Sequence, residues 1–297
     1  MEHLKENDFG MTAELIKGLE IAEKKREEIK EKVVKLKEKG ITPGLAVILV
    51  GNNPASRSYV TGKGKASKEV GIYFELIELP ESITEERLLQ EIDRINQDEN
   101  IHGLLVQLPL PNHIHEEFVI ERISPEKDVD GFHPISIGRM MTGQDTFLPC
   151  TPHGVIELVK EMQIDIKGKH VVVVGRSNIV GKPVGQLFLN ENATVTYCHS
   201  KTTNLKEITK LADILVVAVG RAKLITSDYI KKGAVVIDVG VNRLDTGKLC
   251  GDVNFEDALK VAGYITPVPK GVGPMTITML LHNTVLSAQC SKLACKN

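Results

Sequence analysis

The sequence predicts an α/β protein made of two domains with a ligand cleft between them. Its 297 residues are enough for two domains of ordinary size. Short β-rich runs alternate with helical or polar segments along the chain, as parallel strands joined by helices do. Four successive valines, Val171 to Val174, lead into the glycine turn GRSNIVGKP, a pattern typical of a buried parallel strand followed by a helix.

The first half of the chain begins with a long amphipathic helix. Apolar residues recur at helical spacing from Leu15 to Leu36, and Gly40 ends this helix. Asn53 is suited to cap a later helix, because its side chain accepts hydrogen bonds from backbone N–H groups and Pro54 follows at the first helical position. The other elements expected in this half are strands at 45–50, 72–79 and 102–108 and helices at 54–70 and 85–96.

The second half predicts a Rossmann-type sheet, in which parallel strands are covered by helices. After 171–174, strands are expected at 194–197, 213–219, 234–239 and 264–268. Ligands of such sheets gather beyond the carboxyl ends of the strands. We place the domain boundary at 148–151, where FLPCTP ends the first domain and Thr151 is suited to cap a new helix.

Composition argues against several classes of protein. Lys and Arg number 37 against 39 Asp and Glu, so neither nucleic acid nor a membrane surface is expected as a partner. No run approaches the ~20 apolar residues of a membrane span, and the N-terminus lacks a secretory signal, with Met11 as an alternative start. The cysteines lack C-x-x-C spacing, which favours a reducing cytoplasm and no metal site. They are Cys150, Cys198, Cys250, Cys290 and Cys295.

The turn after Val174 is a candidate phosphate site. A helix N-terminus offers unpaired N–H groups and the positive end of a dipole to an anion. The glycines do not match G-x-G-x-x-G, because Ser177 and Val180 occupy its second and third glycine positions and Gly181 comes one residue late. An ordinary strand-to-helix turn is an equally good interpretation of this segment alone, and the strands downstream favour a nucleotide site.

Several polar residues are placed where the expected strands end. Tyr59 and Lys63 are four residues apart on one helix and therefore share a face. Gln107 lies at the carboxyl end of a strand, and Asp128 and Asp130 follow in the loop KDVDG. Singly, an exposed lysine is usually a solvated charge, and an aspartate before glycine is usually a turn residue. Their convergence at strand ends favours a binding site in the cleft.

Seven motifs occur in order along the chain, and together they resemble the bifunctional methylenetetrahydrofolate dehydrogenase/cyclohydrolase family over residues 13–288. The motifs are Y-V-x-x-K at 59–63, GLLVQLPLP at 103–111, PEKDVDGFHP at 125–134, PCTPHG at 149–154, GRSNIVGKP at 175–183, VIDVGVNR at 236–243 and ITPVPKGVGPMT at 265–276. One departure is visible, since the family usually has a second glycine where this chain has Lys270.

The resemblance implies two reactions in one cleft. A hydride passes from 5,10-methylenetetrahydrofolate to a nicotinamide, and water then converts the 5,10-methenyl cation to 10-formyltetrahydrofolate. Lys63 is expected to assist proton transfer during hydrolysis, and Gln107 matches the glutamine that hydrogen-bonds this lysine.

The resemblance also implies how folate is bound. Asp130, rather than the turn residue Asp128, matches the aspartate that accepts hydrogen bonds from the pterin, and Tyr59 matches the tyrosine that stacks on the aminobenzoyl ring. We expect a helix over 275–297 that returns to the first domain, so that residues 1–149 and this helix form the folate domain and 150–274 form the cofactor domain. Further expected substrate contacts are Val106, Leu108, Pro269, Gly271, Val272, Gly273 and Pro274.

The expected cofactor is NADP rather than NAD. An NAD site normally has an acidic residue after its second strand, and here that strand ends TYCHSKT without a carboxylate. Arg176 and Ser200 match the family's contacts to the 2′-phosphate, and Gly175, Ser177 and Val241 match its other cofactor contacts.

The family resemblance also predicts a homodimer. Three alternatives stay open from the sequence. One is a monofunctional methylenetetrahydrofolate dehydrogenase, another is a shikimate-dehydrogenase-like enzyme with its own lysine–aspartate pair, and the third is a catalytically silent protein that binds folate or nucleotide.

Overall fold

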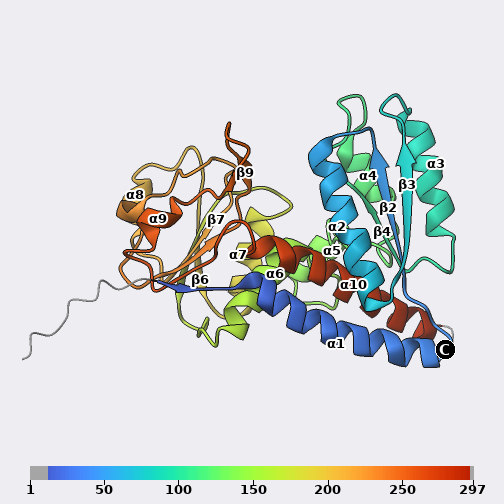
Figure 1. Ribbon diagram of the computed structural model, residues 1–297, viewed down its shortest axis with the longest axis horizontal. Helices are drawn as coiled ribbons and strands as arrows, with labels where there is room; N and C mark the ends of the chain where they lie inside the picture. The colour runs from blue at the N-terminus through green and yellow to red at the C-terminus, as the bar shows by residue number, and fades with distance from the viewer. Residues whose placement is uncertain (1–12, 295–297) are drawn as a thin grey trace, which may run out of the picture.

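The computed structural model describes residues 13–294, so that Met11 and Cys295 lie outside the described residues. Two sheets lie at opposite ends of the molecule, and the long helices α1 (Gly18–Glu38) and α10 (Val272–Ala294) run side by side between and beneath them (Figure 1). We call the smaller sheet with its helices the first lobe and the larger sheet with its helices the second lobe.

The first lobe is built on a three-stranded parallel sheet with the order β3-β2-β4. All seven residues of the central strand, β2 (Gly44–Val50), are buried, which explains its unbroken apolar sequence. β3 spans Tyr73–Leu79 and β4 spans Gly103–Val106. The connecting helices are α2 (Pro54–Val70), α3 (Glu85–Asn96), α4 (Glu116–Arg122) and α5 (Pro134–Met141). Asn53 caps α2 as expected, because its Oδ1 accepts from the N–H groups of Ala55 and Ser56.

The second lobe contains a six-stranded parallel sheet with the order β1-β11-β8-β7-β5-β6. Its strands are β1 (Glu14–Leu15), β5 (His170–Val174), β6 (Thr194–Cys198), β7 (Ile214–Val217), β8 (Val235–Asp238) and β11 (Tyr264–Ile265). Its helices are α6 (Cys150–Glu161), α7 (Gly181–Asn190), α8 (Leu205–Thr209), the short 3-10 helix Ser227–Tyr229 and α9 (Phe255–Ala258). A small antiparallel pair, β9 (Asn242–Arg243) and β10 (Leu249–Cys250), projects from this lobe. The predicted α/β fold with a Rossmann-type second sheet is confirmed.

The N-terminal segment crosses from one lobe to the other. Leu15 was expected at the start of the long helix, but it lies in β1, where it pairs with Ile265 of β11. The helix begins only at Gly18, because Ala13 to Ile16 bond instead to the backbone of the second sheet. A strand of two residues carries too little pattern to be recognised from sequence, and only its distant partner explains it.

Helices α6 and α10 pack against each other where the lobes meet. α6 begins at Cys150 with Pro149 before it, so the prediction that Thr151 caps this helix was wrong. The Thr151 hydroxyl instead lies 2.8 Å from the Thr276 hydroxyl of α10 and joins the two helices. α10 starts three residues earlier than the expected Met275 and contacts α1, α2, β2 and β4 as well. Among the described residues, no helix is long and apolar enough to cross a membrane.

Candidate active site

Lys63 and Gln107 are joined in the first lobe. Lys63 lies on α2 with only 9% of its surface exposed, and its Nζ donates to Gln107 Oε1 over 2.9 Å. Gln107 follows β4, where its N–H bonds to the Ile48 carbonyl and so continues the sheet by one residue. The other end of its amide, Nε2, donates to the Leu108 carbonyl over 2.8 Å. The amide is therefore fixed with its oxygen toward the lysine.

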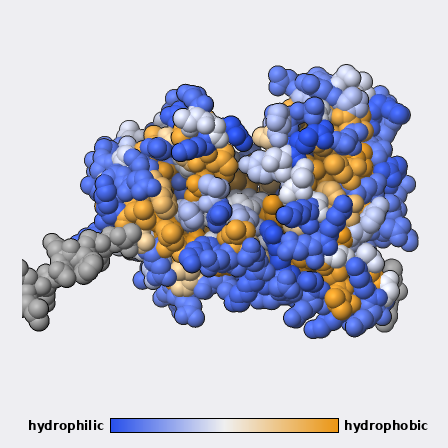
Figure 2. All heavy atoms as spheres, viewed as in Figure 1, coloured by the Kyte–Doolittle hydropathy of each residue, from blue (hydrophilic) through white to orange (hydrophobic). Residues whose placement is uncertain are grey.

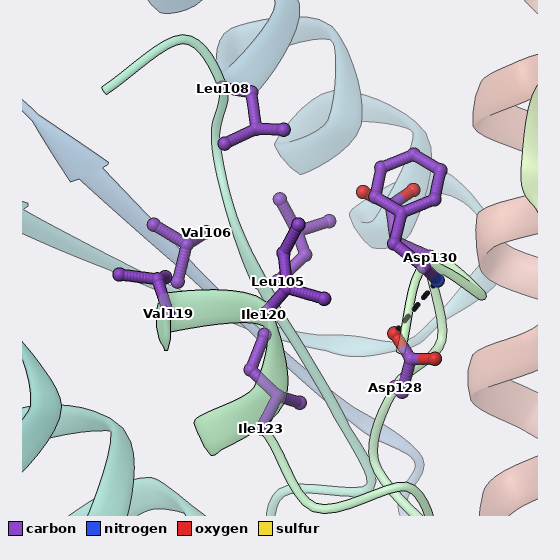
Figure 3. A pocket seen from close by; sticks show the side chains of 9 residues that line it. Leu105, Val106, Leu108, Val119, Ile120, Ile123, Asp128 and Asp130 are labelled. Carbon is purple, nitrogen blue, oxygen red and sulfur yellow. Dashed lines mark hydrogen bonds between the residues drawn. The ribbon is translucent and has the colours of Figure 1, made fainter. Parts of the chain in front are cut away.

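Asp130 lies in a tight loop that Asp128 holds in place. The buried Asp128 carboxylate, drawn in Figure 3, lies near Asp130. It accepts hydrogen bonds from the N–H groups of Phe132 and His133 and from the Ser136 hydroxyl. Burial raises the pKa of Asp128 to about 6, against the effect of these hydrogen bonds. These three donors belong to the segment just after Asp130, so Asp128 helps to hold the loop that carries Asp130.

The Asp130 carboxylate is placed near Lys63 and Cys150. Burial raises the pKa of Asp130, while the positive charge of Lys63 opposes that shift. The backbone beside it is also held, because Val129 O accepts from Cys150 Sγ and from Asn283 Nδ2. Neither Cys150 nor Asn283 was among the residues predicted for the site. Only the packing of α6 against α10 brings them to this loop.

A small apolar pocket lies beside Asp130 at the end of β4. Its lining includes Val106, Leu108 and Asp130, three of the residues expected in the site (Figure 3). Lys63 and Tyr59 do not line this pocket. Tyr59 lies one helical turn before Lys63 on α2, and half of its surface is exposed. A larger hollow separates the two lobes (Figure 2).

The loop after β11 closes the other side of the lobe junction. Gly271 approaches the start of α1 so closely that a Cβ on Gly18 would lie 1.9 Å from the Gly271 carbonyl oxygen. Val272 is buried in the first turn of α10, whereas Pro269 and Gly273 are exposed. Two X-Pro bonds near the site are cis, Leu108–Pro109 and Val268–Pro269.

Lys270 adopts the left-handed conformation in this loop, with φ of +78°. Lys270 therefore replaces the family's usual glycine while the backbone still has the conformation that favours glycine. Its side chain is exposed, and its carbonyl oxygen accepts from the Leu19 N–H.

The turn between β5 and α7 depends on its glycines. Gly175 has φ of +138°, and a Cβ there would lie 2.3 Å from the Ala218 carbonyl oxygen. A Cβ on Gly181 would lie 2.6 Å from the Gly175 backbone. Gly181 lies one residue beyond the third glycine position of the G-x-G-x-x-G motif, and it still allows the helix to pack closely against the turn.

The N-terminus of α7 differs from expectation. We predicted unpaired N–H groups there, but the Ser177 hydroxyl accepts from both Val180 and Gly181, and the Lys182 N–H bonds to the Ser177 carbonyl. Pro183 has no N–H to offer. Ser177 thus caps the helix from within the turn.

The side chains around this turn remain available to a ligand. Arg176 is exposed, and within residues 13–291 its guanidinium has no hydrogen-bond or ion-pair partner. Ser200 is exposed in the turn after β6, and Val241, after β8, is 48% exposed. These segments follow the carboxyl ends of β5, β6 and β8, as expected for a nucleotide crevice.

Two buried carboxylates near the crevice were missed by the sequence analysis. Asp238 ends β8 and Asp252 follows β10, and both are at least 97% buried, with exposures of 3% and 0%. No group of three or more His, Cys, Asp or Glu in the described part of the chain is arranged to bind a metal ion.

One lobe contains a parallel sheet whose strand β5 ends in a glycine turn, and the other brings a buried lysine, a glutamine and an aspartate together. These features define a two-domain, nucleotide-dependent enzyme. The catalytic domain model of tetrahydrofolate dehydrogenase/cyclohydrolase matches residues 16–130, and the NAD(P)-binding domain model matches residues 149–292. The chain belongs to the tetrahydrofolate dehydrogenase/cyclohydrolase family. The predicted family and its NAD(P)-binding second domain are confirmed, which removes the shikimate-dehydrogenase-like alternative.

Individual relatives agree over nearly the whole chain. The bifunctional protein FolD of Bacillus thuringiensis (strain Al Hakam) is 78% identical over 286 residues, which cover 96% of this chain and all of that protein. The crystal structure of the bifunctional FolD enzyme of Campylobacter jejuni has a TM-score of 0.92 at 52% identity, covering 93% of this chain and 99% of that one. The Trypanosoma brucei enzyme, solved with NADP cofactor and inhibitor, has a TM-score of 0.91 at 41% identity, covering 95% and 99%. The predicted bifunctional dehydrogenase/cyclohydrolase is confirmed in preference to a monofunctional dehydrogenase.

Proposed function

We propose that the Lys63–Gln107–Asp130 group is where 5,10-methylenetetrahydrofolate is oxidised and the resulting 5,10-methenyl cation is hydrolysed. The observation that carries this proposal is the 2.9 Å hydrogen bond that holds the buried Lys63 ammonium against Gln107, beside the Asp130 carboxylate. An amine that can transfer protons and a carboxylate that can bind a substrate donor therefore lie in the same region of the first lobe.

Lys63 serves the hydrolytic step. Water adds to the methenyl carbon, and both of its protons leave the oxygen: one is transferred to N5 as the bond between N5 and that carbon breaks, and the other is released to solvent, which leaves neutral 10-formyltetrahydrofolate. Lys63 is the group that carries the proton between these positions. Gln107 accepts one Nζ hydrogen and so orients the amine, while the fixed amide prevents the lysine from turning away.

Asp130 and Tyr59 bind the folate. The pterin presents its N3–H and 2-amino donors side by side, a geometry that suits a carboxylate. Tyr59 offers an exposed aromatic face one turn from Lys63 for the aminobenzoyl ring. Val106 and Leu108 form the apolar wall next to Asp130. We assign further substrate contacts to the segment from Pro269 to Pro274 because of the family resemblance of its motif.

The cofactor that fits the second lobe best is NADP. Bound NADP supplies the hydride acceptor for the oxidation. Among the described residues the Arg176 guanidinium has no hydrogen-bond or ion-pair partner, and together with the Ser200 hydroxyl it suits a 2′-phosphate. Ser177 shapes the turn, and exposed Val241 offers an apolar contact.

A spectrophotometric assay tests the proposal. The enzyme is mixed with 5,10-methylenetetrahydrofolate and NADP, and methenyltetrahydrofolate formation is followed together with its decay. We expect reduced cofactor to accumulate and methenyltetrahydrofolate to decay faster than in buffer. Formation of methenyltetrahydrofolate whose decay is not accelerated by the enzyme would limit the site to oxidation.

We further propose that residues 1–149 with the helix over 275–297 act as the folate domain, that 150–274 act as the cofactor domain, and that the chain forms a homodimer in the cytoplasm. The homodimer rests on the family resemblance, and the free thiols of the described cysteines agree with a reducing compartment. Light scattering after size-exclusion chromatography measures the mass, and a monomer at micromolar concentration would contradict the homodimer.

A further inference from the structure

We propose that Asp252, supported by Asp238, is a positioning residue for the nicotinamide nucleotide, through the two loops that line the crevice. This inference rests on the proposed function of the second lobe as the cofactor domain. Neither carboxylate is assigned a role by the motifs that resemble the family's site residues.

Asp252 joins two loops at the carboxyl edge of the sheet. Its Oδ2 accepts from the N–H groups of Val219 and Gly220, over 2.7 and 2.9 Å. Its Oδ1 accepts from Asn242 Nδ2 over 2.8 Å. Val219 and Gly220 follow β7, and Asn242 begins β9 after β8, so one buried side chain ties the exits of two neighbouring strands.

Asp238 holds the backbone at Asp252 in place through hydrogen bonds. Its Oδ1 accepts from the N–H groups of Gly240 and Asp252, both over 3.0 Å, and its Oδ2 accepts from Val253 N–H over 2.9 Å. The Thr266 hydroxyl in turn accepts from the Asp238 N–H. Burial raises the pKa of Asp238 to about 7, which the nearby Asp252 charge reinforces and the three N–H donors oppose.

Two glycines leave room for this pair. A Cβ on Gly240 would lie 2.2 Å from the Asp252 carboxyl carbon, and a Cβ on Gly251 would lie 1.8 Å from Asp238 Oδ2. Neither glycine has a positive φ, so space for the carboxylates, rather than backbone conformation, explains them. The backbone is therefore shaped around the two buried acids.

The tied loops contact the expected cofactor site on both sides. Ala218, directly before Val219, supplies the carbonyl oxygen that packs against the Gly175 turn. Val241, an expected cofactor contact, lies between Gly240 and Asn242, which bond to Asp238 and Asp252. Asp252 bonds to Val219, Gly220 and Asn242, and it therefore acts on the cofactor through these loops.

The first test is direct NADP binding by Asp252→Asn, measured by calorimetry without folate. The amide keeps the size of the side chain, but it either removes the acceptor of Val219 and Gly220 or sets its own donor against Asn242. We expect the Kd for NADP to rise about tenfold or more, with a similar rise in KM for NADP and a change of less than about twofold in KM for folate.

Asp128→Asn is the matched control, because Asp128 is an equally buried carboxylate with three protein donors in the other lobe. It should raise KM for folate and leave the Kd for NADP within about twofold of wild type. Both variants are compared by thermal unfolding, so that a general loss of stability is measured separately.

Asn242→Ala keeps the test decisive if Asp252→Asn does not fold. This half-buried residue gives up only the Oδ1 bond, so a smaller rise in the Kd for NADP is expected. Unchanged NADP affinity in a folded, less stable variant, or equal increases in both KM values, would overturn the positioning role. Wild-type enzyme that binds NADP but does not oxidise methylenetetrahydrofolate would instead contradict the proposed function.

Discussion

The Nζ of Lys63 and the Oε1 of Gln107 lie 2.9 Å apart, although the two residues are separated by 44 positions in the chain. One comes from a helix and the other from the end of a buried strand, and both elements are held by the core of the first lobe. The proton-carrying group is thus positioned by rigid elements, which suits a step that depends on orientation.

Replacing Lys63 with methionine should therefore affect hydrolysis most. The substitution keeps an unbranched chain but removes the ammonium, and general acid–base catalysis typically contributes about 10²–10⁴-fold in rate. We expect methenyltetrahydrofolate hydrolysis to fall by a factor in that range, while folate binding changes far less. Lys65→Met, at an exposed position two residues away, is the control and should retain activity. Unchanged hydrolysis in folded Lys63→Met would remove this lysine from the mechanism.

Arg176→Ala should shift cofactor preference from NADP toward NAD. Only NADP carries a 2′-phosphate, and hydrogen bonds to charged groups contribute roughly 1.5–3 kcal/mol each. The ratio of kcat/KM values should therefore change by about one to two powers of ten. Arg87→Ala, on α3 of the first lobe, controls for the loss of an exposed arginine. Equal losses with both cofactors would mean that Arg176 only shapes the turn.

Lys270→Gly should stabilise the protein. A left-handed conformation costs a non-glycine residue roughly 1–2 kcal/mol, and the greater freedom of glycine in the unfolded chain offsets part of the gain. We expect a net gain of up to about 1 kcal/mol, measured by denaturant unfolding. Lys223→Gly is matched, because Lys223 is also exposed and left-handed, with φ of +56°. Destabilisation by Lys270→Gly alone would show that the Lys270 side chain makes a contact that outweighs the strain.

His153 should make the protein less stable in acid. Burial lowers its pKa to about 4, assisted by the nearby His282 ring, whose own pKa is lowered by burial. Between about pH 6.5 and 4 the unfolded state then binds more protons than the folded state, so stability falls as the pH drops through that range. One such proton corresponds to about 1.4 kcal/mol per pH unit.

The test is the pH dependence of unfolding in His153→Gln. The slope between pH 6.5 and 4 should become shallower without vanishing, because His282 remains. His113→Gln, at an exposed position, should leave the slope as in wild type. An unchanged slope in His153→Gln would contradict the assignment.

Much of the fold was predictable because its signals are local. The seven buried residues of β2 and the valines of β5 read as continuous apolar runs, since both faces of a parallel strand are covered. Asn53 could be recognised as a helix cap because a cap acts within three residues of itself. Residue type and motif order also placed Lys63, Gln107 and Asp130 among the candidates, and the structure brings these three together.

Contacts between distant segments were decided only by the tertiary structure. β1 forms because Leu15 pairs with Ile265 of β11. Two residues are too few to show the alternating pattern that predicts a strand. Thr151 contacts Thr276 of α10 and does not cap its own helix. The Ser177 hydroxyl accepts hydrogen bonds from the backbone N–H groups that were predicted to be free to bind a phosphate. A polar side chain bonds to whichever donor or acceptor packing brings near it, whereas the local sequence specifies only what it is able to bond.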